Sequence, residues 1–281
     1  MQPQRIAVVH PGAMGAAIAR AIAGNDHHVG WCRTGRSPQT SKRARGLQAF
    51  DELSDLAAWA RAVISVVPPH AAVEMARAVL GCGFAGVYVD ANAIAPTTAR
   101  QIQQLVEDAG CLYVDGGIIG PPPTTPAGSR LYLARGSAAR QAASDIAALF
   151  EGSTFEAPVL DDSLGPTAAS ALKMVYAAWT KGGAALLLAT ARAAEALGVM
   201  AALEQEWQRS LPETPARLER TKGAAGPKAW RYVGEMLEIA RAFEDAGQTG
   251  GFHRAAAEVY EQLAAAHRHR AGGPREAGPE A

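Results

Sequence analysis

The chain has 281 residues, which is long enough for two domains that each bury an apolar interior. Its 27 basic and 27 acidic residues cancel, so the chain lacks the positive charge expected of a nucleic-acid-binding protein, and a small-molecule partner is favoured. The 3 cysteines contain no CxxC pair, and no stretch approaches the roughly 20 apolar residues that cross a bilayer, so we expect no disulfide framework, no membrane partner and a cytoplasmic location.

The first half of the sequence alternates short β-branched runs with longer helical patterns. The run Ile6 to Val9 is followed by a helical pattern in which Met14, Ile18 and Ile22 recur at four-residue spacing. Further strands are predicted at 28–32, 62–67, 87–90, 111–115 and 130–134, and further helices near 70–80, 97–109 and 138–150. This alternation predicts an α/β doubly wound domain of the Rossmann type, which we assign to residues 1–160.

The character of the sequence changes after Pro158. Residues 167–197 form an Ala-rich and Leu-rich segment without proline, which predicts a long helix with a bend at Gly182 and Gly183. More helical patterns and no strand pattern follow, so residues 161–270 are predicted to form an all-α domain. The Gly/Pro/Glu-rich tail, 271–281, is predicted to be disordered.

A glycine-containing turn follows the first predicted strand. It reads His10-Pro11-Gly12-Ala13-Met14-Gly15 and matches the dinucleotide pattern GxGxxG, except that His10 replaces the first glycine. Gly12 would allow the backbone to approach a pyrophosphate, and the helix amides would face its oxygens. The alternative is an ordinary turn with incidental glycines, but the order of strand, turn and helix favours a dinucleotide site.

The end of the second predicted strand should select between NAD and NADP. An acidic residue there would bind the ribose hydroxyls of NAD, but the segment reads Cys32-Arg33-Thr34-Gly35-Arg36, and no acid occurs between Asp26 and Asp51. Arginine binds phosphate through two parallel hydrogen bonds, so Arg33, Thr34 and Arg36 predict NADP rather than NAD. A solvated basic loop is the alternative interpretation.

With these motifs the chain resembles the β-hydroxyacid dehydrogenase superfamily, which includes 3-hydroxyisobutyrate dehydrogenases, 6-phosphogluconate dehydrogenases and imine reductases. The resemblance covers nearly the whole chain and is closest to the branch with a phosphogluconate-dehydrogenase-like C-terminal domain. It implies that Gly12, Ala13, Met14 and Gly15 hold the cofactor phosphates. It also implies that the strand end Val67-Pro68-Pro69 and Asn92 lie near the nicotinamide side of the cofactor, and that the helical half forms a homodimer.

The same resemblance implies a substrate site. The segment Asp115-Gly116-Gly117-Ile118-Ile119-Gly120 is similar to the substrate-binding loop of the family, and the helix that contains Ser170 and Lys173 carries the position of its catalytic lysine. Two departures stand out, because the family usually has a serine at the position of Ile119 and an asparagine at that of Ala177. The substrate therefore stays open. A capping role for Asp115 is the alternative to substrate binding.

Lys173 is the expected acid–base group. Hydride transfer from a carbinol leaves a hydroxyl proton that some group must accept, and a desolvated lysine suits that task. Tyr176, one turn later, is a second candidate for catalysis, although it could equally be a packed aromatic residue. No HExxH-like pattern appears, so no metal is expected.

These observations predict an NADP-dependent dehydrogenase of a small 3-hydroxy acid or a related β-hydroxy compound. The alternative is an NADPH-dependent imine reductase, but imine reductases of this family generally carry Asp or Tyr at the position of Lys173. A third hypothesis is an inert dinucleotide sensor, since the serine and the asparagine of the family are both replaced.

Overall fold

The computed structural model describes residues 2–123, 128–225 and 229–270, and the chain forms two compact units, Met1–Lys173 and Met174–Ala281. The sequence placed this division at residue 160, ahead of the long helix, whereas the structure places it within that helix. The predicted disordered tail, 271–281, lies outside the described residues. Within the described ranges, no helix combines the length and the apolar character needed to span a membrane.

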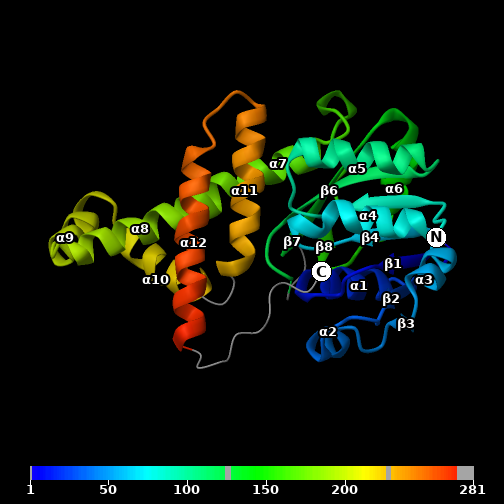
Figure 1. The fold of residues 1–281 in the computed structure, drawn as a ribbon, viewed down its shortest axis with the longest axis horizontal. Helices are drawn as coiled ribbons and strands as arrows, with labels where there is room; N and C mark the ends of the chain where they lie inside the picture. Colours follow the sequence, from blue (N-terminus) through cyan, green and yellow to red (C-terminus); the bar gives the residue numbers. More distant parts are fainter. Residues whose placement is uncertain (1, 124–127, 226–228, 271–281) are drawn as a thin grey trace. The chain divides into compact units, whose positions relative to one another are not determined.

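The first unit is built on a sheet of 8 strands (Figure 1). In chain order the strands are β1 (Arg5–Val8), β2 (His28–Cys32), β3 (Gln48–Phe50), β4 (Ala62–Ser65), β5 (Val87–Asp90), β6 (Leu112–Ile119), β7 (Ser129–Arg135) and β8 (Phe155–Glu156). They lie side by side in the order β3-β2-β1-β4-β5-β6-β7-β8. Strands β1 to β6 pair in parallel, β7 runs antiparallel to β6, and β8 runs parallel to β7. The predicted doubly wound Rossmann fold is confirmed.

The helical segments of this unit follow the strands. They are α1 (Ala13–Ala23), α2 (Pro38–Arg43), α3 (Leu53–Trp59), η1 (Pro69–Ala71), α4 (Ala72–Gly81), α5 (Pro96–Asp108), η2 (Ser137–Ala139), α6 (Arg140–Ala148), η3 (Asp162–Leu164) and α7 (Ala168–Ala177). The sequence did not predict the short elements β3, β8, α2 and α3. Helix α2 begins where the Ser37 hydroxyl accepts a hydrogen bond from the Thr40 amide, with proline in the first helical position.

Two apolar layers cover the sheet, one on each face. Helices α1 and α6 supply one layer, and Ile18 and Ile22 of α1 belong to the same buried cluster as Ile146 of α6. Helices α3, α4 and α5 supply the other layer, which includes Leu56 and Ile102. Because both faces are covered, the central strands are apolar on both sides, and this explains why their sequences read as continuous apolar runs.

The strand that carries the expected substrate loop is longer than predicted. The sequence ended this strand at Asp115 and treated the residues that follow as a loop, whereas β6 continues to Ile119. Up to Asp115 the strand pairs in parallel with β5, and from Val114 onward it pairs with β7, from Val114 opposite Arg135 to Ile119 opposite Arg130. The new partner strand supplies the backbone hydrogen bonds that keep residues 116–119 extended.

The second unit is helical throughout its described part. Its elements are η4, a π-helical turn (Ala178–Gly182), followed by α8 (Gly183–Ala196), α9 (Met200–Ser210), α10 (Thr214–Ala225), α11 (Ala229–Asp245) and α12 (Gly251–Arg270). The segments α7, η4 and α8 follow without interruption, so the predicted long helix is present, and a π turn stands next to the glycine pair. Helices α11 and α12 lie side by side (Figure 1) and bury Met236 and Tyr260.

Candidate active site

The glycine-containing turn brings the end of β1 into close contact with the start of α1. The Gly12 amide donates a hydrogen bond to the carbonyl of His10 at 2.9 Å, so the chain reverses within three residues. A Cβ atom on Gly15 would lie 2.2 Å from the same carbonyl oxygen, so this position requires glycine. Gly12 caps the helix without a side-chain hydrogen bond. The residues therefore fit a dinucleotide, because the first amides of α1 have no side-chain cap in front of them.

The histidine that replaces the first glycine has a partner that the sequence did not reveal. The Nη1 atom of Arg36 lies 3.0 Å from His10 Nδ1, and its Nη2 atom donates to the carbonyl of Val9 at 3.3 Å. Burial lowers the pKa of Arg36. Arg36 therefore stabilises the turn itself, and its guanidinium is fixed beside the place where the helix amides begin.

The basic turn after β2 binds an acidic residue that was not among the predicted site residues. Asp51, the residue after β3, receives a bidentate hydrogen bond from Arg33, with Nη2 at 2.8 Å from Oδ2. Thr34 donates its hydroxyl to the backbone carbonyl of Asp51 at 2.5 Å. The Arg33 and Asp51 side chains are 58% and 62% exposed, so solvent screens the pair and it contributes little stability.

Asn92 joins the ends of two neighbouring strands. Its Oδ1 atom accepts from the amide of Val67 at 2.6 Å, and its Nδ2 atom donates to the Ser65 hydroxyl at 3.2 Å. The side chain is buried, so its hydrogen bonds lie inside the fold. Asn92 thus fixes the backbone that leads into Pro68 and Pro69, the segment expected under the nicotinamide side of the cofactor.

Two buried carboxyl groups lie next to each other on the central strands. Asp90 ends β5, and Asp115 occupies the paired position of β6. Burial raises the pKa of Asp90 to about 7; the hydrogen bond from the Asn92 amide opposes this shift, and the charge of Asp115 adds to it. Burial likewise raises the pKa of Asp115 to about 6, against the hydrogen bonds from Ser170. The sequence analysis gave Asp90 no role, although it ends a strand as Asp115 does in the predicted pattern.

Helix α7 is held on β6 by the second of these carboxylates. Asp115 accepts the Ser170 hydroxyl at 2.5 Å and the Ser170 amide at 2.8 Å. Asp115 and Ser170 are both among the predicted substrate-binding residues, and here both are buried and bind each other. A buried carboxylate is stabilised by such internal donors. The pair positions the helix.

The glycine pair of β6 allows the helix to lie very close to the strand. A Cβ atom on Gly117 would lie 2.4 Å from the carbonyl oxygen of Ala169, and one on Gly116 would lie 2.9 Å from that of Asp90. At this distance Lys173, one turn after Ser170, donates from Nζ to the carbonyl of Ile118 at 2.7 Å. Lys173 is therefore fixed above the second half of β6.

The remaining predicted site residues are divided between core and surface. Ile118 and Ile119 are buried within β6, so the position where the family has a serine is part of the apolar core. Gly120 has a φ of 118°, a conformation that favours glycine, and it ends the strand. Tyr176 is 46% exposed, and its phenol is accessible on the helix one turn after Lys173.

Comparison with known families agrees with this arrangement. Residues 5–152, more than half of the chain, match the NAD binding domain of 6-phosphogluconate dehydrogenase. The chain belongs to the β-hydroxyacid dehydrogenase superfamily. Residues 194–263 match a domain of unknown function, DUF1932. A member of this superfamily binds NAD(P) on its first domain, and the chain is an NAD(P)-dependent oxidoreductase.

Individual relatives match this chain over most of its length. An uncharacterized 28.5 kDa protein of Methanothermus fervidus is 29% identical over 218 residues, which are 76% of this chain and 77% of that protein. A conserved protein of unknown function, described as similar to 3-hydroxyacid dehydrogenases, has 25% identity and a TM-score of 0.66, covering 96% of this chain and 100% of its own.

Two structures of lower identity share the fold. The 3-hydroxyisobutyrate dehydrogenase of Mycobacterium tuberculosis is 19% identical with a TM-score of 0.69, and the match covers 95% of each chain. A reductive aminase of Aspergillus terreus, solved with NADPH and ethyl levulinate, is 17% identical with a TM-score of 0.56, and the match covers 96% of this chain and 95% of the aminase.

The buried Asp90 makes the stability of this protein depend on pH. Its folded-state pKa of about 7 lies above the ordinary value of 3.8, so the folded state holds more protons than the unfolded state between these values. The free energy of unfolding should therefore fall as the pH rises through this window. Between about pH 5 and about pH 8 the free energy of unfolding should fall in the wild type. In Asp90→Asn this fall should be smaller by on the order of 1 to 3 kcal/mol.

Urea unfolding at the two pH values measures this difference. Asp108→Asn serves as a control, because Asp108 lies at the exposed end of α5 and should leave the pH dependence of the wild type unchanged. The same pH dependence in wild type and Asp90→Asn would show that Asp90 does not titrate in this window.

Proposed function

We propose that this chain is an NADP-dependent dehydrogenase of a small 3-hydroxy acid or a related β-hydroxy compound, with Lys173 as its acid–base group. The observation that carries the proposal is the position of Lys173, which is held by the carbonyl of Ile118 at the end of the sheet where doubly wound folds bind ligands. When bound, the nicotinamide supplies the hydride acceptor or donor. The chain has to orient the substrate, exclude water and move one proton.

The proton moves between the substrate oxygen and the Lys173 amine. In the direction of oxidation the substrate hydroxyl gives its proton to a neutral Nζ while its carbon loses a hydride, and a carbonyl group forms. In reduction the ammonium returns that proton to the developing alkoxide and stabilises its negative charge. The carbonyl of Ile118 accepts a hydrogen bond from Nζ at 2.7 Å and so holds the amine in place for this transfer.

The two departures from the family remove polar groups from the region of Lys173. Ala177 is buried where the family has an asparagine, and Ile119 is buried where the family has a serine, so neither side chain supplies a hydrogen bond. A carboxylate on the substrate therefore has to accept hydrogen bonds from donors other than this serine. These apolar positions favour a β-hydroxy compound whose binding depends on the amine of Lys173.

NADP is the cofactor we propose, on the basis of the turn after β2. Arg33 presents its guanidinium fork at the place where the ribose is expected, and it already binds one anion, the Asp51 carboxylate, in a bidentate manner. A 2′-phosphate offers the same acceptor geometry with more charge. Asp51 then has two effects: it orients Arg33 before the cofactor binds, and it repels the phosphate when the cofactor arrives.

A second candidate function is NADPH-dependent imine reduction. The exposed phenol of Tyr176 favours it, because a phenol can donate the proton that a reduced imine nitrogen needs. Lys173 argues against this function, since it occupies the position where imine reductases of the family generally carry another residue. A panel of hydroxy acids, β-hydroxy amino acids and cyclic imines separates the two, and absence of turnover on all of them would support the inert sensor.

We further propose that the protein is a homodimer formed through its helical unit. Several large apolar side chains of that unit are exposed, among them Trp179 at 74% and Phe252 at 77%, and Leu186 is exposed as well. Exposed apolar side chains that gather on one surface mark protein contacts in water, and we propose that these side chains do so in the dimer. Light scattering at micromolar concentration should give the mass of two chains, and Trp179→Glu/Leu186→Glu should give that of one. A monomeric wild type would contradict the proposal.

Replacement of Lys173 tests the catalytic proposal. Lys173→Ala should lower kcat by about a hundredfold to ten-thousandfold, the share that a positioned acid–base group supplies. The Kd of NADPH, measured by its fluorescence, should stay within about threefold, because the cofactor is held by the turn at Gly12 and by Arg33. Retained turnover together with loss of turnover in Tyr176→Phe would transfer the role to Tyr176.

Opposite changes at Arg33 and Asp51 test the cofactor. Arg33→Ala should weaken NADPH about tenfold to a hundredfold and leave NADH nearly unchanged. Asp51→Asn should tighten NADPH by about fivefold, because it removes the repulsion between the carboxylate and the phosphate.

The exposed Arg45, which follows helix α2, provides the control, since Arg45→Ala removes a charge without removing the fork. Equal changes for NADPH and NADH in the Arg33 variant would argue against NADP as the preferred cofactor. Weaker NADPH binding in Asp51→Asn would mean that Asp51 acts only by orienting Arg33.

A further inference from the structure

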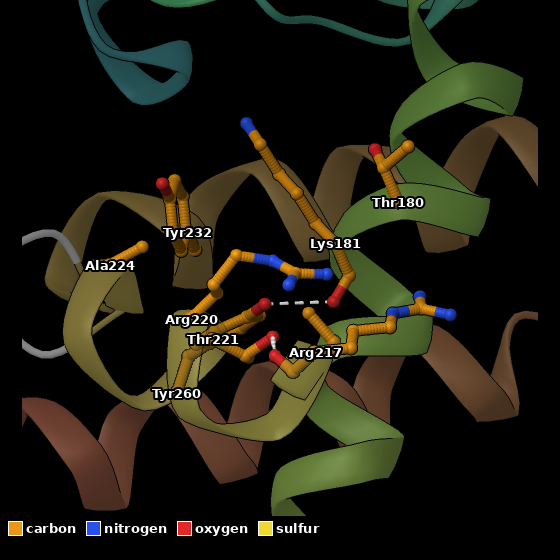
Figure 2. Close-up of a pocket in the computed structure, with 9 residues that line it drawn as sticks. Thr180, Lys181, Arg217, Arg220, Thr221, Ala224, Tyr232 and Tyr260 are labelled. Atoms are coloured by element: carbon orange, nitrogen blue, oxygen red, sulfur yellow. Dashed lines mark hydrogen bonds between the residues drawn. The ribbon is translucent and has the colours of Figure 1, made fainter. Parts of the chain in front are cut away.

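The helical unit contains a pocket of about 290 Å³ that the proposed function does not use (Figure 2). Every residue that lines it belongs to the second unit, and the lining includes neither the glycine turn nor Lys173. The lining residues come from the π turn and from α8, α10, α11 and α12, and they are Thr180, Lys181, Ala184, Arg217, Arg220, Thr221, Ala224, Tyr232 and Tyr260.

The π turn forms one wall of this pocket and is held in place by Tyr260. The Tyr260 hydroxyl donates to the carbonyl of Lys181 at 2.8 Å, and its ring meets that of Tyr232 edge to face at 5.1 Å. Thr180 returns its hydroxyl to the backbone of Tyr176 at 3.0 Å. The wall is therefore held by specific hydrogen bonds and by the buried ring of Tyr260. Such π turns often occur at functional sites.

The charges around the pocket do not cancel. Lys181 forms an ion pair with Glu235, and its ammonium lies 4.7 Å from the centre of the Tyr232 ring, so this cation is already neutralised. Arg217 and Arg220 contribute two more cations, and neither forms an ion pair with any residue in the described part of the chain. Figure 2 shows the Arg220 side chain extending from α10 toward Lys181, whereas the Arg217 side chain extends across α8, where its Nη2 atom lies against Gly183. An excess of two positive charges therefore remains.

The uncharged groups of the pocket define the rest of the ligand. Burial raises the pKa of Tyr232, so its phenol stays protonated and can donate a hydrogen bond. The rings of Tyr232 and Tyr260 with Ala184 and Ala224 provide apolar contacts. The volume lies near the lower end of ligand pockets, which are roughly 300 to 1,000 Å³, so the ligand has to be small.

We propose that this pocket binds a small organic phosphate monoester. A monoester carries about two negative charges near neutral pH, which matches the excess of two positive charges at Arg217 and Arg220. A carboxylate would compensate only one of these charges, and a longer or nucleotide-sized molecule would exceed the volume. The organic group of the ligand then packs on the tyrosine rings.

Calorimetric titration of the full-length protein with phenyl phosphate tests this site. NADPH is present at saturating concentration, so the phosphate positions of the first unit are already occupied. We expect one saturable site with a Kd below about 1 mM, and weaker binding of inorganic phosphate, which lacks the ring. Arg217→Gln/Arg220→Gln should weaken phenyl phosphate by at least about tenfold, since it removes two charge-assisted contacts.

Lys222→Ala is the matched control, because Lys222 lies on the same helix but pairs with Glu219 outside the pocket. This variant should bind phenyl phosphate within about twofold of the wild type. Both arginines are exposed, so the double variant should keep the thermal midpoint of the wild type, which verifies its fold. No saturable binding to the wild type, or equal affinity in the double variant, would overturn the proposal.

Discussion

The structure of the proposed catalytic region depends on the close packing of helix α7 against strand β6. Two features make it possible, namely the absence of side chains at Gly116 and Gly117 and the buried hydrogen bonds from Ser170 to Asp115. If helix α7 shifted along β6, the buried carboxylate of Asp115 would lose these donors, which is energetically costly. The helix is therefore fixed in one register. Lys173 lies one turn further along, and its place over the carbonyl of Ile118 follows from that register.

The elements that the sequence predicted best are those whose pattern is local. The runs at Ile6 and Val87 are apolar because they lie between two layers of helices, and the Gly12 to Gly15 turn follows its strand directly. The Rossmann fold, the helical second unit and the position of the cofactor turn could therefore be read from spacing and composition. The extension of β6 to Ile119 could not, because it depends on pairing with β7.

The contacts that the sequence could not predict join residues far apart in the chain. Asp51 reaches Arg33 only because the three-residue strand β3 pairs with β2, and so short a strand has no clear periodicity. In the same way, Ser170 and Asp115 are polar residues with the pattern of a binding site, but they meet each other across 55 positions. The pocket at Arg217 and Arg220 also requires the packing of separate helices. Pattern reveals which chemistry is present, and packing decides whether it faces a ligand or the core.

The most direct test of this account is the rate of hydride transfer in Gly117→Ala. The added methyl group would lie 2.4 Å from the backbone of Ala169 and should displace the helix that carries Lys173. In single-turnover measurements we predict a rate at least about tenfold below the wild type, with a Kd for NADPH within about threefold, because a small misplacement strongly slows a positioned reaction. Gly81→Ala, which meets nothing within 4 Å, should behave as the wild type. An unchanged rate in Gly117→Ala would contradict the central claim that this packing positions the catalytic lysine.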